Sequence, residues 1–546
     1  RCHFGSSNAA TSAFCPVPGC KVAMFGNQDR RQDYNDDYYG RQREPVGASI
    51  ATTNPQDGVG MFGRGMPVGF AAFLAEFTGT FLLVFTAGTT VLTESTWSTP
   101  WAVATVSSAL CYAFYPVSGG HFNPAISLAA GLSKKLEWPV VIGYMSMQVS
   151  GAFCAGQLFS WLLGKRQMVG PVENYNIHYA GGVELIYTFM LCFVYLNCST
   201  TMRSRGNKFY GLATGMTYLA GGYAAGGVSG GVFNPALVFG LDGITLDWMP
   251  WAYAAYEMSG GVFAAMNFCI IHPEEFDDPG LRQLDARVEP GPLQKGLAEF
   301  IGTFLFVFTF GLNLSSGSSA TPYSAGSCFL SMTYALADVS GAYFNPAFVL
   351  ATLLSGRGRL RFSDSMICWL AQGMAGSMAG LLYGAYHVAG GSMQGRPISV
   401  GPGLEHGFHK YSLPVALTME CMFTGLIALV YLSVVDTNND TRFYFGLVVG
   451  FAIVAAGFAC GHISGGNLNP ALVLGICTGQ LGHQADYVFQ AVPWANSLWY
   501  SSMEMTGAAI STAVFYFIYR DDYRKGRYVE VNPLPPLDEK SRGYCY

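Results

Sequence analysis

The sequence predicts an all-α membrane protein with twelve transmembrane helices and four re-entrant half-helices, arranged as two units that are each an inverted repeat. Three observations lead to this fold class: a composition poor in charge, a series of twelve long apolar stretches, and an Asn-Pro-Ala tripeptide that occurs four times. Of the 546 residues, 51% are hydrophobic and 12% are charged, whereas soluble domains carry about 25% charged residues. The formal net charge of −5 gives no reason to expect nucleic acid as a partner.

The apolar stretches form two series of six. The first occupies residues 68–92, 100–117, 138–163, 180–201, 208–228 and 249–271, and the second 293–314, 324–339, 364–386, 412–435, 443–461 and 493–519. Most are long enough to cross about 30 Å of hydrocarbon as a helix. We therefore divide the chain into a polar N-terminal tail (1–66), a first unit (67–272), an acidic linker (273–292), a second unit (293–519) and a C-terminal tail (520–546).

The chain repeats itself at two levels. Ala75–Phe81 of the first unit matches Ala298–Phe304 of the second, which indicates a tandem duplication. Within each unit a second motif occurs twice, as Ser-Gly-Gly-His-Phe-Asn-Pro-Ala (118–125), Ser-Gly-Gly-Val-Phe-Asn-Pro-Ala (229–236), Ser-Gly-Ala-Tyr-Phe-Asn-Pro-Ala (340–347) and Ser-Gly-Gly-Asn-Leu-Asn-Pro-Ala (464–471). Three spans separate the two copies within a unit, so these copies enter the membrane from opposite sides, as in an inverted repeat.

Loop charge predicts the orientation of the chain. If both termini are cytosolic, the loops after the second and fourth spans of each unit are also cytosolic. Those loops carry Lys134, Lys135, Arg203, Arg205, Lys208, Arg357, Arg359, Arg361 and Arg442, whereas the opposite loops carry Lys165, Arg166, Arg396 and Lys410. The excess of positive charge follows the positive-inside rule and predicts cytosolic termini.

Each Asn-Pro-Ala tripeptide opens an apolar run that is too short to cross a bilayer, and therefore predicts a re-entrant half-helix. Asparagine is a strong N-cap, and proline at the first helical position gives up an amide that has no partner anyway. Two half-helices that meet from opposite faces bring their positive ends, about half a charge each, to the middle of the membrane. Such ends disfavour cations, and the asparagine amides can hydrogen-bond a passing solute.

Four such motifs in a duplicated membrane chain resemble the major intrinsic protein (aquaporin) family, over about 68–272 and 293–519. The resemblance implies a passive channel and not an enzyme, with no cofactor and no metal. It implies pores lined by Asn123, Pro124, Ala125, Asn234, Pro235, Ala236, Asn345, Pro346, Ala347, Asn469, Pro470 and Ala471. It also implies buried glutamates that accept hydrogen bonds from the re-entrant loops, at Glu76, Glu184, Glu299 and Glu420.

The resemblance also assigns the selectivity filter, the narrowest part of the pore, and here the sequence departs from the family. The filter falls on Val103, Gly222, Gly231 and Leu237 in the first unit and on Ala325, Gly457, Gly466 and Leu472 in the second. The arginine that the family carries after the second Asn-Pro-Ala is leucine in both units, and the aromatic residue and histidine of a strict water channel are absent. One interpretation is a wide, apolar filter for water or small uncharged solutes. The other is a closed pore in a non-conducting structural membrane protein, or in a subunit of a larger assembly.

Two further acids, Glu257 and Glu504, lie in the sixth span of each unit, where the family usually has proline. Gln148 and Gln372 hold the matching place in the third spans. An ionisable group inside a membrane is a functional candidate by default, and could bind a cation, a proton or a partner. The alternative is a carboxyl satisfied by nearby hydroxyls and backbone amides.

The expected partners follow from this interpretation. They are the lipid bilayer, water or a small neutral solute, and a second copy of the chain. Family members assemble as tetramers of six-span units, so two fused units imply a homodimer that forms a pseudo-tetramer. The polar tails are candidate docking segments for other proteins.

Overall fold

The computed structural model describes residues 69–524, apart from 94, 96, 173, 205–206, 243–246, 277–288, 391–398, 406–407, 410, 438–439 and 484–491. The predicted N-terminal tail, most of the predicted linker and most of the C-terminal tail therefore lie outside the described residues.

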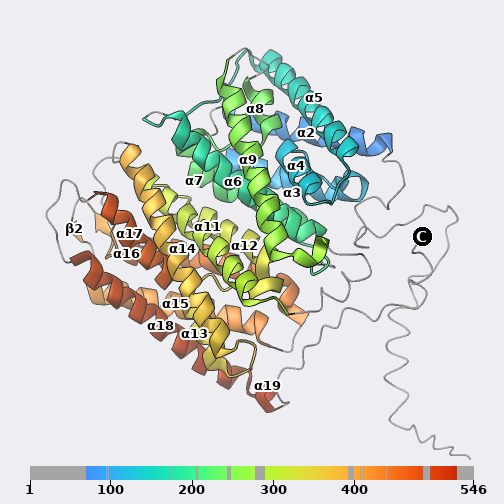
Figure 1. The fold of residues 1–546 in the computed structure, drawn as a ribbon. Coiled ribbons are helices and arrows are strands. Elements are labelled where there is room, and N and C mark those ends of the chain that lie inside the picture. The colour runs from blue at the N-terminus through green and yellow to red at the C-terminus, as the bar shows by residue number, and fades with distance from the viewer. Residues whose placement is uncertain are drawn as a thin grey trace, which may run out of the picture. The chain divides into compact units, whose positions relative to one another are not determined.

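Both units contain six long helices and two short ones within the described ranges (Figure 1). The first unit has α2 (Phe70–Leu92), α3 (Thr99–Ser118), α4 (Pro124–Leu132), α5 (Trp138–Leu163), α6 (Ile177–Thr200), α7 (Tyr210–Ser229), α8 (Pro235–Asp242) and α9 (Met249–Ile271). The second has α11 (Pro292–Ser316), α12 (Thr321–Ser340), α13 (Pro346–Ser355), α14 (Phe362–Ala389), α15 (Leu413–Val435), α16 (Phe445–Ser464), α17 (Pro470–Gly479) and α18 (Val492–Ile518). Shorter elements are η1 (Pro273–Phe276), β1 (Leu404–Glu405), β2 (Phe408–His409), η3 (Asp440–Tyr444), η4 (Gln480–His483) and α19 (Arg520–Arg524).

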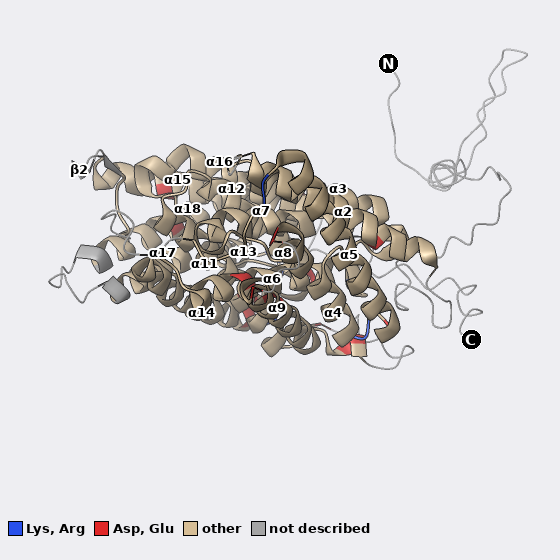
Figure 2. Ribbon diagram, turned by 90° about the horizontal axis from the view of Figure 1, so that it is seen from above, with Lys and Arg blue, Asp and Glu red and all other residues tan. Residues whose placement is uncertain are grey.

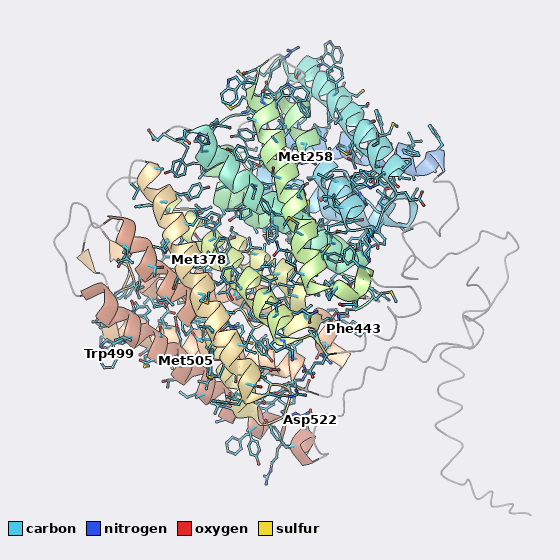
Figure 3. All side chains as sticks on the ribbon, viewed as in Figure 1. Met258, Met378, Phe443, Trp499, Met505 and Asp522 are labelled. Carbon is cyan, nitrogen blue, oxygen red and sulfur yellow. The ribbon has the colours of Figure 1, made fainter. Side chains whose placement is uncertain are left out.

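The twelve long helices of the described chain coincide with the twelve predicted spans to within a few residues, and the four short ones begin at the four predicted prolines. The predicted all-α fold is therefore confirmed. Among the described helices, seven are long and apolar enough to cross a membrane by length and composition alone. Large apolar side chains cover the outer surface, including Trp161 (79% exposed) and Phe517 (73% exposed). Figure 3 shows Trp499 and Met378 on α18 and α14, and both are more than half exposed.

Glycines allow the helices of one unit to approach closely. A methyl group on Gly151 of α5 would lie 2.4 Å from the Phe77 carbonyl oxygen of α2, and one on Gly260 of α9 would lie 2.5 Å from the Leu185 carbonyl oxygen of α6. These distances are too short for any side chain. Close backbone contact at small residues is how helices pack in lipid, where no hydrophobic force draws them together.

The two units contact each other through α6 and α7 of the first and α11 and α12 of the second. Hydroxyls on α12 donate to carbonyls of α7, from Ser324 to Ala220 at 2.6 Å and from Ser331 to Ala213 at 2.8 Å. The hydroxyl oxygens of Tyr187 on α6 and Thr309 on α11 lie 3.0 Å apart. The interface within the chain therefore includes several buried hydrogen bonds.

The start of the linker packs onto the first unit through a buried cluster of charges. Glu275 forms an ion pair with Lys135, and Glu274 forms one with Arg203, each at 2.7 Å. Burial favours the neutral form of Glu274, but hydrogen bonds from His272 and Arg203 outweigh burial and lower its pKa to about 2. These two acids, which belong to the predicted acidic linker, thus tie two loops of the first unit together.

Candidate functional site

Each of the four short helices begins at the proline of an Asn-Pro-Ala tripeptide, and the asparagine caps it. The side-chain oxygen of each asparagine accepts a hydrogen bond from the backbone N–H two residues further on. The distances are 2.8 Å at Asn123, 3.0 Å at Asn234, and 2.9 Å at both Asn345 and Asn469. Because the cap and the proline satisfy the first turn locally, the helix can begin inside the protein without water.

The two short helices of each unit meet at their N-termini through the same asparagines. In the first unit the Asn123 amide donates to the Phe233 carbonyl, and the Asn234 amide donates to the Phe122 carbonyl, each at 2.9 Å. The second unit repeats this exchange with Asn345 and Leu468 at 2.9 Å and with Asn469 and Phe344 at 2.8 Å. The positive ends of both helix dipoles are thereby held at one point in each unit.

The residue before each asparagine adopts a left-handed backbone conformation that side chains other than glycine rarely take. Its φ is 48° at Phe122, 55° at Phe233, 50° at Phe344 and 55° at Leu468. This conformation costs of order 1–3 kcal/mol at a non-glycine residue. It aims the carbonyl at the opposite asparagine, so the loop needs strong local support.

Glu76 supplies that support in the first loop of the first unit. One of its oxygens accepts hydrogen bonds from the Ser118 hydroxyl at 2.6 Å and the His121 backbone N–H at 3.0 Å. The other accepts from the Phe122 backbone N–H and the Gln148 side-chain amide, each at 2.8 Å. Glu76 is fully buried. Donors to a buried carboxylate make stronger bonds than neutral pairs, which holds the strained loop in place.

The other three loops are held by glutamates in the same way. Each glutamate accepts from one serine hydroxyl and from two successive backbone N–H groups of its loop. The sets are Glu184 with Ser229, Val232 and Phe233; Glu299 with Ser340, Tyr343 and Phe344; and Glu420 with Ser464, Asn467 and Leu468. Figure 2 shows mostly uncharged helices with a few acidic segments among them.

Glu257 and Glu504 contact the second re-entrant loop of their units. Glu257 accepts the backbone N–H of Asn234 at 2.8 Å with one of its oxygens, and its carboxyl lies beside that of Glu184. Glu504 lies beside the equivalent two groups, the Asn469 backbone and the Glu420 carboxyl, but its oxygens accept no hydrogen bond from the described residues. Both acids are fully buried. The sequence-based alternative of a carboxyl satisfied by backbone amides describes part of this setting, but the carboxyl–carboxyl contact was not foreseen.

The structure brings some of the predicted filter residues together. A methyl group on Gly231 would lie 3.3 Å from the Cα of Gly222, so these two glycines are neighbours. In the second unit a methyl group on Gly466 would lie 3.2 Å from the Cα of Gly461. Gly461 lies one helical turn beyond the predicted filter residue Gly457. The remaining filter positions are buried, with exposed fractions of 7% for Val103, 3% for Leu237, 2% for Ala325 and 0% for Leu472. Their assignment to a filter stays a prediction.

Sequence reasoning missed Tyr218, whose hydroxyl lies at the meeting point of the half-helices in the first unit. The Asn123 amide nitrogen lies 3.5 Å from this hydroxyl, and the Asn234 side chain lies near it. A signal was present, because Tyr218 is four residues before Gly222 and therefore lies on the same face of α7 as a predicted filter residue.

These observations define an integral, multi-pass membrane protein in which two six-helix units each hold a pair of opposed half-helices. The model of the major intrinsic protein family matches residues 67–268 and 287–498. The chain therefore belongs to the major intrinsic protein family, as two tandem fused units. Members of this family are channels and not enzymes.

Curated relatives match this chain over about the length of one unit. Aquaporin NIP2-1 of Oryza sativa subsp. japonica is 30% identical over 220 residues, which cover 38% of this chain and 73% of the relative. Glycerol uptake facilitator protein-like 6 of Lactiplantibacillus plantarum is 33% identical over 210 residues, which cover 36% of this chain and 95% of the relative. Aquaporin NIP1-1 of Zea mays is 29% identical over 223 residues, covering 39% of this chain and 77% of the relative.

Proposed function

We propose that this chain is a passive channel for water or small uncharged solutes, with an apolar filter that lacks the family arginine. The observation that carries the proposal is the meeting of two half-helix N-termini in each unit, with both asparagine amides held at the junction. Such a junction offers hydrogen-bond donors to a neutral solute and a positive potential to a cation. The relatives named as an aquaporin and as a glycerol uptake facilitator support the same class of permeant.

The filter proposal rests on Leu237 and Leu472, which directly follow the second tripeptide of each unit. An arginine there adds a fixed charge and narrows the passage, whereas leucine does neither. Without that charge the helix dipoles remain the barrier to cations. Gly222 and Gly457 pack closely against Pro100 and Pro322, because a methyl group on either glycine would lie 2.9 Å from the proline Cβ.

The first prediction tests the filter by restoring the charge in both units. Proteoliposomes carrying the Leu237→Arg plus Leu472→Arg chain are expected to pass glycerol and urea more slowly than the wild-type chain in stopped-flow experiments. Water flux, driven by an impermeant osmolyte, is expected to fall less, because water can pass through a narrower opening than glycerol or urea can. Leu237→Met plus Leu472→Met is the control for a change of shape without charge, and its fluxes are expected to match those of wild type.

Two other outcomes are informative. Equal solute fluxes in the wild-type and arginine chains, with both proteins folded, would place the filter elsewhere. Wild-type flux no faster than that of protein-free liposomes would instead support a non-conducting structural membrane protein or a subunit of a larger assembly.

We also propose that two chains assemble into a pseudo-tetramer through the surfaces that the tandem contact leaves open. That contact uses α6 and α7 of the first unit and α11 and α12 of the second. The equivalent surfaces lie on α2 and α3 and on α15 and α16, and these two pairs of helices do not pack on each other within the described residues. Ala220 of α7 is fully buried, whereas its equivalent Ala455 of α16 is exposed, and Phe451 beside it is 61% exposed. A two-fold axis that places α15 and α16 of each chain on α2 and α3 of the other would close the ring.

The second prediction is a specific cross-link between chains. Within the chain Ser331 of α12 bonds the Ala213 carbonyl of α7. Counted from the tripeptide asparagines, the equivalent residues are Ala109 of α3 and Val448 of α16. The Ala109→Cys plus Val448→Cys chain is expected to form a covalent dimer on mild oxidation in membranes. Either single variant, which keeps all the natural cysteines, is expected to stay monomeric on denaturing gels. Native mass measurements that find monomers alone would contradict the proposed assembly.

A further inference from the structure

Tyr218 occupies the centre of the first unit. Each tripeptide asparagine has two N–H groups on its amide, and one of them is used on the opposite loop carbonyl. In the first unit the Tyr218 hydroxyl lies 3.5 Å from the Asn123 amide nitrogen and near the Asn234 side chain. The phenol therefore lies where a solute would have to bind these two asparagines.

The second unit has no hydroxyl at this position. Tyr218 lies 16 residues before Asn234, and the residue 16 before Asn469 is Ile453. Each is also the ninth residue of its helix, α7 or α16. Isoleucine cannot accept a hydrogen bond and has a shorter side chain. The second N–H groups of Asn345 and Asn469 are therefore left for a solute.

The exposed fractions of the asparagines also differ between the two junctions, and the second unit has the more exposed pair. Asn123 and Asn234 are each 0% exposed, whereas Asn345 and Asn469 keep 3% and 2%. Tyr218 itself is 4% exposed, so its ring is enclosed. Both asparagines of the second unit thus keep a little exposed surface, whereas those of the first are fully buried.

The second unit does have an aromatic residue near this level, Phe329 of α12, but its ring packs into the core. It lies edge-on to Phe306 and to Phe344, with ring centroids 5.6 Å away in both cases. A third edge contact, to Phe348, has a centroid distance of 6.1 Å. These contacts hold the ring of Phe329 against α11 and the loop before α13.

We infer that Tyr218 closes the pore of the first unit at its midpoint, and that the second unit is the conducting one. This inference rests on the proposed channel function and divides it between two pores on one chain. Tyr218 replaces the solute on the asparagines, while the first unit keeps its fold and its contact with the second. Conduction is thereby determined by one side chain on each fifth span.

The test exchanges the two side chains and measures water and glycerol flux in proteoliposomes of the full chain. Ile453→Tyr is expected to reduce flux to that of protein-free liposomes, because both junctions would then carry a phenol. Tyr218→Ile is expected to raise flux above wild type. The double variant, Tyr218→Ile plus Ile453→Tyr, is expected to conduct through the first unit. Comparing Ile453→Phe with Ile453→Tyr separates the effect of the bulk of the ring from the effect of its hydroxyl.

The gain of flux in Tyr218→Ile over wild type, and in the double variant over Ile453→Tyr alone, cannot come from misfolding, so both comparisons protect the test from that explanation. Wild-type flux that Ile453→Tyr leaves unchanged would overturn the inference while leaving the proposed channel intact. A silent wild-type chain would contradict both the channel proposal and the assignment of conduction to the second unit. In that case flux gained by Tyr218→Ile would still support the plug, and continued silence would overturn it.

Discussion

Replacing Glu299 with alanine is expected to prevent the second unit from folding stably, and Glu76→Ala is expected to do the same in the first. The Glu299 carboxylate accepts hydrogen bonds from Ser340, Tyr343, Phe344 and Gln372 at 2.6 to 3.0 Å. Alanine would leave all of these donors buried without a partner, at about 1–3 kcal/mol each. The sum is comparable with the whole stability of an ordinary domain, about 5–15 kcal/mol.

Thermal unfolding in detergent, followed by tryptophan fluorescence, measures this effect, together with the yield of monodisperse protein. Glu289→Ala is the matched control, because the Glu289 side chain is 56% exposed and pairs with Lys295 and Arg361 at the surface. Exposed ion pairs contribute about 0–1 kcal/mol, so this variant is expected to unfold near the wild-type temperature. A Glu299→Ala chain as stable as Glu289→Ala would show that the loop holds its shape without the glutamate.

The positions of the helices could be predicted from the sequence because each depends on local properties. An apolar run of membrane length becomes a spanning helix wherever it lies in the chain, as the predicted 138–163 and the observed Trp138–Leu163 illustrate. A short apolar run behind Asn-Pro carries its own cap and start. The spanning helix and the start of the half-helix both depend on residues within one or two turns of each other.

The contacts at the junction depend on packing between distant segments and could not be predicted in the same way. Tyr218 and Asn123 are 95 residues apart in the chain. The spacing to Gly222 places Tyr218 on the face of a predicted filter residue, but nothing local indicates that its phenol meets the Asn123 amide. Glu274 and Glu275 present the same problem, since acids beside a proline look like a solvated linker. Their burial depends on Arg203 and Lys135, which come from separate loops.

The inverted repeat relates the two halves of each unit by position but not by side-chain chemistry. In the first half the amide of Gln148 donates to Glu76 at 2.8 Å, and that of Gln372 donates to Glu299 at 2.7 Å. In the second half the matching helices carry Glu257 and Glu504, which face Glu184 and Glu420. An amide can donate to a carboxylate, but an ionised carboxyl cannot. We therefore expect each pair of acids to share one proton. That proton would form the hydrogen bond that the glutamine N–H forms in the first half.

The last prediction follows from this comparison. The Glu257→Gln plus Glu504→Gln chain is expected to fold, unfold and conduct like wild type, because each glutamine supplies the donor that its counterpart supplies in the first half. Glu257→Ala plus Glu504→Ala is expected to be destabilised, since the Asn234 backbone N–H loses its acceptor at a cost of about 1–3 kcal/mol.

The infrared band of protonated carboxylic acids is expected to weaken in the glutamine chain. If that band is unchanged, the wild-type acids are ionised. If solute flux instead becomes independent of an imposed proton gradient only in the glutamine chain, the two acids couple transport to protons and the channel is not purely passive.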